Sequence, residues 1–394
     1  MDYEKAPSGW SLIRMEEACE LRKEAINPVE HSSMRYVGLE HIDPGNPELK
    51  RNGNSSEVNS SKSRFYPGDI LYGKLRPYLD KSALVDFEGL CSTDILVLKS
   101  KESTIPQFLV NLIHTNQFLN YAISTSTGVN HPRTSWSSIS AFQFLLPPLP
   151  EQRAIALALR AVQGAREARL REVALERERK AALMKHLFTH GTRGEATKMT
   201  EIGEMPESWK TGKIGDFIKF KSGESRPDNI VSKPALDKTV PVYGGNGIMG
   251  YTNKIFSENR HLIIGRVGEY CGCIHFAEPP NWITDNALYS KKWLGDRLLF
   301  HFAASYLNYL NLNQFKRKAG QPLITQGVLN EIEIFLPPVE EQNMIASISR
   351  SCDSKIAALD QEARLLEELF RAMLEELMSG RLPAGALVRA ESGG

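Results

Sequence analysis

The sequence lacks the marks of a secreted or membrane-bound protein. Its five cysteines are an odd number at irregular spacing, which argues against a disulfide framework and favours a reducing cytoplasm. They are Cys19, Cys91, Cys271, Cys273 and Cys352. No apolar run approaches the roughly 18 residues that span a bilayer, and the polar, acidic N-terminus is not a secretory signal. We therefore expect a cytoplasmic protein that does not contact a membrane.

An excess of charge of one sign is also lacking. The formal net charge is +1, so the composition neither supports nor excludes a polyanionic ligand, which needs only a local basic face. The hydrophobic content of 41% and charged content of 24% are typical of a globular protein. A length of 394 residues suits about two domains with connecting elements.

The sequence has few motifs that would indicate an enzyme. It contains no G-x-x-x-x-G-K-[ST] phosphate loop, no [ND]-P-P-[YF] tetrapeptide of amino-methyltransferases, and no persuasive Ser/His/Asp or Cys/His arrangement. The Cys271, Cys273 and His275 pattern has no second ligand pair at zinc-site spacing, so we expect buried strand cysteines instead. We predict no catalytic residue and no metal or cofactor bound by this chain.

One glycine-rich segment resembles a dinucleotide-binding motif. Residues 245–250 match G-x-G-x-x-G after a strand-like stretch, but such a site needs a helix to begin there, and residues 251–254 are a poor helix start. We interpret the segment as a glycine-rich turn that exposes Tyr243, Asn246 and Tyr251.

The most informative feature is an internal repeat. A P-x-x-W motif at 7–10 recurs at 206–209, and an L-P-P segment ending in Glu-Gln at 146–152 recurs at 336–342. Each L-P-P segment is followed by a helical stretch that stops at a glycine, Gly191 or Gly380. Ordered matches at nearly constant spacing indicate a tandem duplication.

The two helical stretches differ in their apolar patterns. The second has a sustained heptad seam, which needs a partner helix. Its residues are Ile345, Ile348, Cys352, Ile356, Leu359, Ala363, Leu366, Phe370, Met373 and Leu377. The seam of the first helix is interrupted by Arg166, Arg169 and Arg177. We expect the two helices to pair antiparallel within the chain; a homodimeric coiled coil is the alternative.

The regions between the repeated motifs predict mixed α and β structure. Residues 11–146 and 210–336 contain short strand-like runs separated by turns. We expect strands at 69–72, 95–98, 261–264 and 331–335, and helices at 106–121 and 296–310. The predicted fold class is α+β: two mixed α/β domains in tandem, separated by two long helices that form an antiparallel coiled coil with pseudo-two-fold symmetry.

Clusters of basic, amide and aromatic residues predict DNA-binding surfaces. Basic side chains would neutralise phosphates, and Asn, Gln or Arg would contact base edges. The first half contributes Lys74, Arg76, Tyr78, Lys81, Asn130 and Arg133. The second half contributes Tyr243, Asn246, Tyr251, Lys316, Arg317, Lys318 and Gln321. A glycine-containing basic loop precedes each L-P-P segment at a similar distance, at 127–133 in the first half and 318–322 in the second. The shared position favours a ligand-binding role for both loops; an ordinary solvated surface is the alternative.

The chain resembles the specificity subunits of Type I restriction-modification systems. The resemblance covers residues 7–380, and its most specific parts are 146–152 and 336–342. Residues 65–78 and 241–248 also resemble segments of that family's target recognition domains. The polar middle of the first helix is a departure from the expected coiled coil.

The resemblance implies a division of labour among subunits. Each target recognition domain would recognise one half of a bipartite DNA site, and the two helices would set the spacing between the halves. Two modification subunits carrying S-adenosylmethionine would methylate adenine in double-stranded DNA, and restriction subunits would supply the ATP- and Mg-dependent motor and nuclease. Two alternatives remain: a coiled-coil scaffold without a DNA role, and an enzyme that itself methylates or cuts DNA.

These inferences predict the following division of the chain. The first target recognition domain is 1–150, the first spacer helix 151–190, a linker 191–205, the second target recognition domain 206–338, the second spacer helix 339–380, and a flexible tail 381–394.

Overall fold

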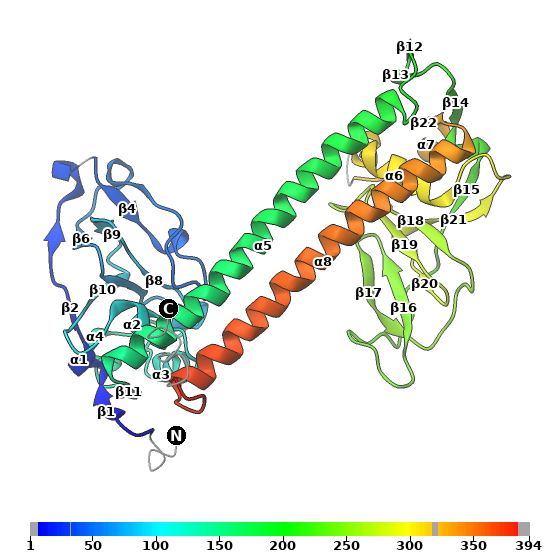
Figure 1. The fold of residues 1–394 in the computed structure, drawn as a ribbon. Helices are drawn as coiled ribbons and strands as arrows, with labels where there is room; N and C mark the ends of the chain where they lie inside the picture. Colours follow the sequence, from blue (N-terminus) through cyan, green and yellow to red (C-terminus); the bar gives the residue numbers. More distant parts are fainter. Residues whose placement is uncertain (1–6, 32, 317–321, 385–394) are drawn as a thin grey trace. The chain divides into compact units, whose positions relative to one another are not determined.

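The computed structural model describes residues 7–31, 33–316 and 322–384. The chain divides into two compact units, one of residues 1–170 with 361–394 and the other of residues 171–360. Each unit holds one α/β domain and one half of each long helix, α5 (Leu149–His190) and α8 (Val339–Met378) (Figure 1). Residues 385–394 of the expected tail lie outside the described residues.

The first domain contains two main sheets and a short closing pair. One sheet has the antiparallel strand order β2-β10-β7-β8, and the other has the order β3-β6-β9-β4-β5, in which β4 and β9 are parallel. β1 pairs with β11, so the first and last strands of the domain are neighbours. The strands are β1 Ser11–Arg14, β2 Cys19–Leu21, β3 Ala25–Ile26, β4 Arg35–Val37, β5 Gly53–Asn54, β6 Lys62–Phe65, β7 Ile70–Gly73, β8 Ser82–Leu84, β9 Gly89–Cys91, β10 Ile95–Ser100 and β11 Gln143–Leu146. The α-helices are α1 Met15–Ala18, α2 Pro106–Ile113, α3 Asn116–Ser124 and α4 Trp136–Ile139, and the short 3₁₀ helices are η2 Pro28–His31, η3 Leu39–His41, η4 Ser55–Glu57 and η5 Pro77–Leu79.

The second domain repeats this plan with a smaller second sheet. Its main sheet has the order β15-β21-β18-β19, its second sheet is β17-β16-β20 with β16 and β20 parallel, and β14 pairs with β22 as β1 pairs with β11. The strands are β12 Thr197–Thr200, β13 Gly203–Pro206, β14 Lys210–Lys213, β15 Ile218–Ser222, β16 Val240–Gly244, β17 Gly247–Thr252, β18 His261–Gly265, β19 Ile274–Ala277, β20 Trp282–Ile283, β21 Ala287–Trp293 and β22 Glu333–Leu336. The helices are η6 Ile214–Asp216, α6 Phe300–Tyr309, η7 Leu312–Phe315 and α7 Gln326–Glu331. β12 and β13 form a hairpin within the stretch expected to be a linker.

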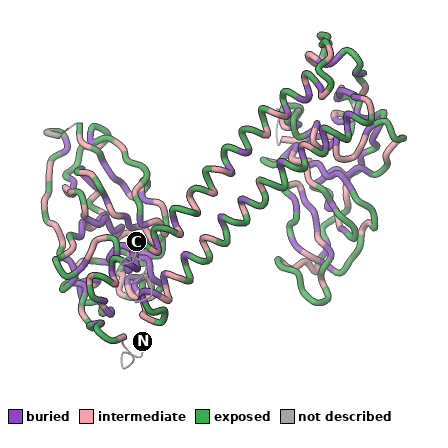
Figure 2. Tube along the Cα trace, in the orientation of Figure 1, coloured by how far each residue is buried: buried purple, intermediate pink, exposed green. Residues whose placement is uncertain are grey.

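Each domain completes its core with both long helices. In the first unit Phe108 and Phe144 of the domain pack in one cluster with Ile155 of α5 and Phe370 of α8. In the second unit the corresponding cluster contains Trp209, Phe302 and Tyr306 of the domain, Phe188 of α5 and Ile345 of α8. Figure 2 shows buried residues gathered in the domains and mostly exposed residues along the long helices. Burial of an apolar stripe against a domain stabilises helix ends that would be marginal in isolation.

The two long helices pair antiparallel, as expected, and all ten residues of the predicted α8 seam are buried or half-buried. The arginines that interrupt the α5 seam form ion pairs across it instead. In the first unit Arg166 pairs with Glu367 (2.8 Å) and Arg169 with Glu362 (2.7 Å). In the second unit the cross-helix pairs are Arg177–Asp360, Glu176–Lys355 and Lys180–Asp353. Residue numbers fall along α8 as they rise along α5, so charge complementarity specifies the antiparallel register where apolar packing is thin.

Three predicted elements have different limits from those expected. The predicted helix at 106–121 is two helices, because Thr115 caps a new helix by accepting a hydrogen bond from the N–H of Phe118. The predicted helix at 296–310 begins only at Phe300. The predicted strand at 331–335 begins at Glu333, since α7 extends to Glu331. The strands expected at 69–72, 95–98 and 261–264 are confirmed within a residue or two at their ends.

None of the helices in the described ranges combines the length and hydropathy of a transmembrane span.

Candidate nucleic-acid interface

A buried glutamine joins the start of each long helix to its domain. The Oε1 atom of Gln152 accepts one backbone N–H bond, and its Nε2 donates to two backbone carbonyls; Gln342 forms the same set of bonds in the second half. The partners are Ile105, Ser103 and Pro147 for Gln152, and Leu299, Arg297 and Pro337 for Gln342. Both side chains are fully buried. The bonds of Gln342 hold the chain before Phe300 in a non-helical path, which explains the late start of α6.

The P-x-x-W motif completes the same joint. Nε1 of Trp10 donates to the Glu151 carboxylate at 3.0 Å, and Nε1 of Trp209 donates to the Glu341 carboxylate at 3.0 Å. The glycine that ends a long helix lies against each motif with a positive φ, and a Cβ atom there would crowd the motif's proline. These glycines are Gly380 beside Pro7 and Gly191 beside Pro206. The repeated motifs therefore build the frame of each half rather than a ligand site.

In the first domain this frame supports a corner formed by two loops. The loop at 74–81 follows β7 and is joined by backbone hydrogen bonds to the loop at 127–133: the Arg76 N–H donates to the carbonyl of Pro132 (2.7 Å), and the Thr134 N–H donates to that of Lys74 (3.0 Å). The Lys74 N–H donates to the carbonyl of Asp94, and the Gly73 N–H to that of Lys81. Residues far apart in sequence thus share one surface, which we call the first corner (residues 74–81 and 127–133).

The second domain has an equivalent corner. The loop at 266–273 follows β18, and its Gly268 N–H donates to the carbonyl of Pro322 (3.1 Å), while the Ile324 N–H donates to that of Arg266 (2.9 Å). The Arg266 N–H donates to the carbonyl of Asn286, and the Gly265 N–H donates to the Cys273 carbonyl, each matching a bond in the first domain. We call this surface the second corner (residues 266–273 and 322–324).

Several predicted DNA-binding residues meet at the first corner. Tyr78 is 52% exposed, Asn130 and Arg133 are exposed, and Lys74 and Arg76 are half-buried. The Arg76 guanidinium lies 3.2 Å from Nδ1 of His131, and Arg133 pairs with Asp94. Lys81 is directed elsewhere, because its ammonium donates to the carbonyl oxygen of Leu39.

In the second half the structure contradicts one of the predictions. The expectation that Tyr243 is exposed is wrong: it is 6% exposed and packs with Ile263 and Ile283, since β16 is an inner strand of its sheet. Asn246 is exposed in the turn between β16 and β17, whereas Tyr251 and Lys316 are half-buried. The other predicted residues, Arg317, Lys318 and Gln321, lie outside the described residues.

Sequence reasoning missed two residues of the second corner, Arg266 and Tyr270. Arg266 follows β18 as Lys74 follows β7, and Tyr270, at 46% exposed, is the counterpart of Tyr78. Alignment of G-K-L-R-P-Y at 73–78 with G-R-V-G-E-Y at 265–270 would have revealed both. The turn that carries Asn246 lies beside this corner, because a Cβ on Gly245 would be 3.1 Å from the Asn286 carbonyl oxygen. The backbone of this turn thus lies beside that of Gly265 and Arg266.

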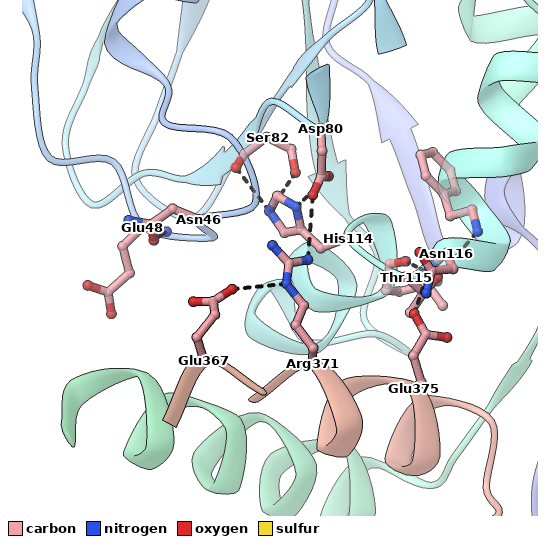
Figure 3. A network of polar contacts seen from close by, with 12 residues as sticks. Asn46, Glu48, Asp80, Ser82, His114, Thr115, Asn116, Glu367, Arg371 and Glu375 are labelled. Carbon is pink, nitrogen blue, oxygen red and sulfur yellow. Dashed lines mark hydrogen bonds and ion pairs between the residues drawn. The ribbon is translucent and has the colours of Figure 1, made fainter. Parts of the chain in front are cut away.

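A Ser–His–Asp chain in the first domain has the connectivity of a hydrolase triad. Nδ1 of His114 lies 2.7 Å from the Asp80 carboxylate, and its Nε2 lies 3.0 Å from the Ser82 hydroxyl (Figure 3). Ser82, however, has no exposed surface, and His114 is 2% exposed. A nucleophile must reach its substrate, so these contacts stabilise the fold rather than perform catalysis.

The cysteines of the Cys271 to His275 pattern lie in the turn before β19, not on a strand as expected, and Cys273 is only half-buried. Burial raises the pKa of the Cys271 thiol above its ordinary value. Across the described ranges, no three His, Cys, Asp or Glu side chains gather as a metal site would require.

Comparison with known proteins agrees with the duplicated architecture. The family described as "Type I restriction modification DNA specificity domain" matches residues 7–174 and again 206–368. The MjaVIII specificity subunit of a type I restriction enzyme from Methanocaldococcus jannaschii is 22% identical over 75% of this chain and 75% of its own length. The EcoDI specificity subunit of Escherichia coli is 30% identical over 38% of this chain and 34% of its own.

A solved structure shares the fold across nearly the whole chain. The S subunit of the Type I restriction-modification system from M. genitalium superposes with a TM-score of 0.63 at 15% identity, covering 94% of this chain and 96% of that one. Two family matches, each spanning one corner with the P-x-x-W and Glu-Gln motifs of its frame, lead to one conclusion: this chain belongs to the Type I restriction modification DNA specificity family, with one copy of the domain in each half.

Proposed function

We propose that this chain is the DNA sequence-specificity subunit of a Type I restriction-modification complex and has no catalytic site of its own. It recognises a bipartite double-stranded DNA site, one half with each domain. The observation that carries the proposal is the presence of the same loop corner twice, on matching frames, with different side chains at its surface. Two corners with different chemistry suit an asymmetric DNA site.

The first corner offers groups for both backbone and base contacts. Lys74 and Arg76 supply positive charge for phosphates, while Asn130 and Arg133 can form bidentate contacts with adenine and guanine. Tyr78 provides an exposed aromatic ring. In the second corner Arg266, Tyr270 and the neighbouring Asn246 offer the equivalent groups. Arg266 is partly oriented already, since its guanidinium donates to the Ser222 hydroxyl.

Partner subunits are proposed to supply the chemistry. Two modification subunits, with S-adenosylmethionine, would methylate adenine, and restriction subunits would contribute the ATP- and Mg-dependent motor and nuclease. Large apolar side chains exposed on the long helices support partner binding, because such side chains commonly mark interaction surfaces when they cluster. In the first unit they include Leu157, Leu365 and Leu369, which are 53%, 52% and 47% exposed. A chain that acts on host DNA would function in the cytoplasm.

The test is a map of methylated adenines in host DNA with and without this gene, followed by a domain exchange. Replacing residues 11–146 with the equivalent domain of a relative should change one half of the methylated site and leave the other half intact. Unchanged sites after the exchange would refute the assignment. A coiled-coil scaffold without a DNA role predicts no salt-dependent DNA binding even with partner subunits present, and an autonomous enzyme predicts methyl transfer by the purified chain alone.

The proposed spacer role of the helices has its own test. Two extra turns would be inserted in α5 after Gly164, where a side chain would meet nothing within 4 Å, and two at the facing position of α8. This site leaves the joint at Glu151 and Gln152 intact. A seven-residue insertion lengthens a helix by about 10 Å, equivalent to about three base pairs of duplex. The unspecified spacer of the methylated site should lengthen accordingly, and an unchanged spacer would contradict the proposal.

A further inference from the structure

The loops of the two corners follow the same backbone path with different residues at two special positions. In the second corner Gly268 and Gly272 have φ values of 76° and 90°, in the left-handed region that glycine adopts freely. The matching backbone hydrogen bonds align these glycines with Arg76 and Asp80, whose φ values are 52° and 50°. Non-glycine residues adopt this conformation only when their surroundings hold them there. The side chains at these positions in the first corner therefore need an explanation.

The contacts of the Asp80 side chain explain how this residue is held in the left-handed conformation. Its carboxylate accepts from Nδ1 of His114 at 2.7 Å and lies 3.8 Å from the guanidinium of Arg371 on α8. The carbonyl oxygen of Asp80 accepts from the N–H of Gly45 at 2.8 Å. The Asp80 side chain is 15% exposed, so water screens these contacts only weakly. Asp80 thus links the loop to the domain core and to α8 at once (Figure 3).

The α8 side of this link is itself held in place. Nε of Arg371 donates to the Glu367 carboxylate at 3.1 Å, which orients the guanidinium toward Asp80. One turn further along, the Glu375 carboxylate accepts from the N–H of Asn116 at the start of α3. Figure 3 shows both contacts beside the Asp80–His114 pair. All of these residues lie in the first unit, so the contacts join one domain to its own part of α8.

Among the residues that the structure describes, no equivalent link holds the second corner, because Gly272 takes the place of Asp80. A Cβ on Gly272 would lie 2.6 Å from the backbone nitrogen of Asn313, so the position has no room for a side chain. Instead, the side-chain amide of Asn313 donates a hydrogen bond to the backbone carbonyl of Cys271. The loop at 266–273 is thus held through its backbone. The two corners therefore keep one conformation by different means.

We propose that Asp80 is a positioning residue for recognition of the first half-site: it fixes the 74–81 loop to α8 and so holds Arg76 and Tyr78 in the orientation that contacts DNA. This inference rests on the proposed function. Asp80 itself does not touch DNA. Its role is to limit the conformations of the loop before binding, because a contact made by a preorganised side chain loses less entropy.

The test uses the complete complex with its modification subunits and compares Asp80→Gly with the unmodified protein. Glycine suits the left-handed conformation, as the second corner demonstrates, so this variant removes the carboxylate without straining the backbone. Methylation rates are measured on the cognate site and on sites with one changed base in either half. We expect discrimination in the first half-site to fall about tenfold, in line with coupling between contacting residues, and discrimination in the second half-site to stay unchanged.

Further variants separate positioning from stability. Asp86→Gly, at an exposed carboxylate of the same domain, is the matched control and should alter neither half-site. Arg371→Ala should reproduce part of the Asp80→Gly effect and add nothing when combined with it. Asp80→Gly also removes the partner of the buried His114, so its melting temperature should fall below that of the parent protein, and the comparison of the two half-sites separates this loss of stability from a loss of positioning.

Equal loss of discrimination in both half-sites, or no loss in either, would overturn the positioning role. The proposed function fails in a different way: the unmodified complex would then methylate no discrete site, and that result would overturn both proposals.

Discussion

The side chains of the first and second corners differ from each other far more than the two frames that support them do. In both halves a buried glutamine, a tryptophan–glutamate hydrogen bond and a helix-ending glycine build the same joint. At the corners, by contrast, the same backbone bonds carry Arg76 and Asp80 in one half and two glycines in the other. Backbone bonds and frame contacts therefore define the loop path, so the exposed side chains can differ between the two corners.

The largest loss of stability is expected when a glycine of the second corner is replaced by the aspartate found at the same position in the first corner. Gly272→Asp places a Cβ atom 2.6 Å from a backbone nitrogen in a position where only glycine fits. We expect it to destabilise the second domain by at least about 3 kcal/mol, measured by chemical unfolding. The control is Gly268→Arg, where a Cβ meets nothing within 4 Å; it should cost only the strain of about 1–2 kcal/mol. Similar losses for both variants would contradict this account of the corner.

Removal of the glutamine joints tests whether the frames are equivalent. Gln152→Ala and Gln342→Ala each delete a fully buried amide that makes three hydrogen bonds to the backbone. Each should lower the free energy of unfolding by about 2–3 kcal/mol, because buried backbone groups lose their partners. A large effect in one half alone would show that the repeat is not energetically symmetric.

The tryptophan–glutamate bonds should reveal a smaller, unequal effect. Trp209 donates to Glu341, which is fully buried, whereas Trp10 donates to Glu151, which is half-buried. We expect Trp209→Phe to cost about 2 kcal/mol and Trp10→Phe about 1 kcal/mol, since water can replace the lost partner of the half-buried Glu151 but not that of the buried Glu341. Equal costs, measured by thermal unfolding, would remove burial as the explanation.

The smallest effect is expected in the polar part of the helix pair. Hydrogen bonds from Lys355 and then Arg179 lower the pKa of the Glu176 carboxyl below its usual value. A depressed carboxyl pKa contributes stability at neutral pH that is lost as the pH falls through the folded-state pKa. Glu176→Gln should therefore lower the melting temperature slightly at neutral pH, and the difference from the parent should disappear in acid. A difference independent of pH would indicate lost packing instead of lost charge.

Much of the architecture follows from local patterns. The heptad seam of α8, the central strands and the paired long helices could be predicted because periodicity and repeated motifs report on local structure and on burial along a single element. The resemblance to a known family supplied the division into two recognition domains. Lys74, Arg76 and Tyr78 are neighbours because they lie in one short loop, and their contact with DNA stays a prediction.

The failures have a common cause. Tyr243 was expected to be exposed because it adjoins a glycine-rich turn, yet its strand is flanked on both sides and its ring packs in the core. The sequence also did not indicate that the ammonium of Lys81 donates to the carbonyl oxygen of Leu39 in η3; the DNA contact of Lys81 stays a prediction. In each case the deciding neighbours come from distant parts of the chain.

The two similar halves, their long helices and the family of the chain could be recognised from the amino-acid sequence, because these properties depend on motifs and periods that run along the chain. Tertiary contacts alone establish that the loops at 74–81 and 127–133 share one corner, and that Asp80 binds both His114 and α8. Those relations arise from hydrogen bonds and burial between segments far apart in sequence, and no local pattern encodes them.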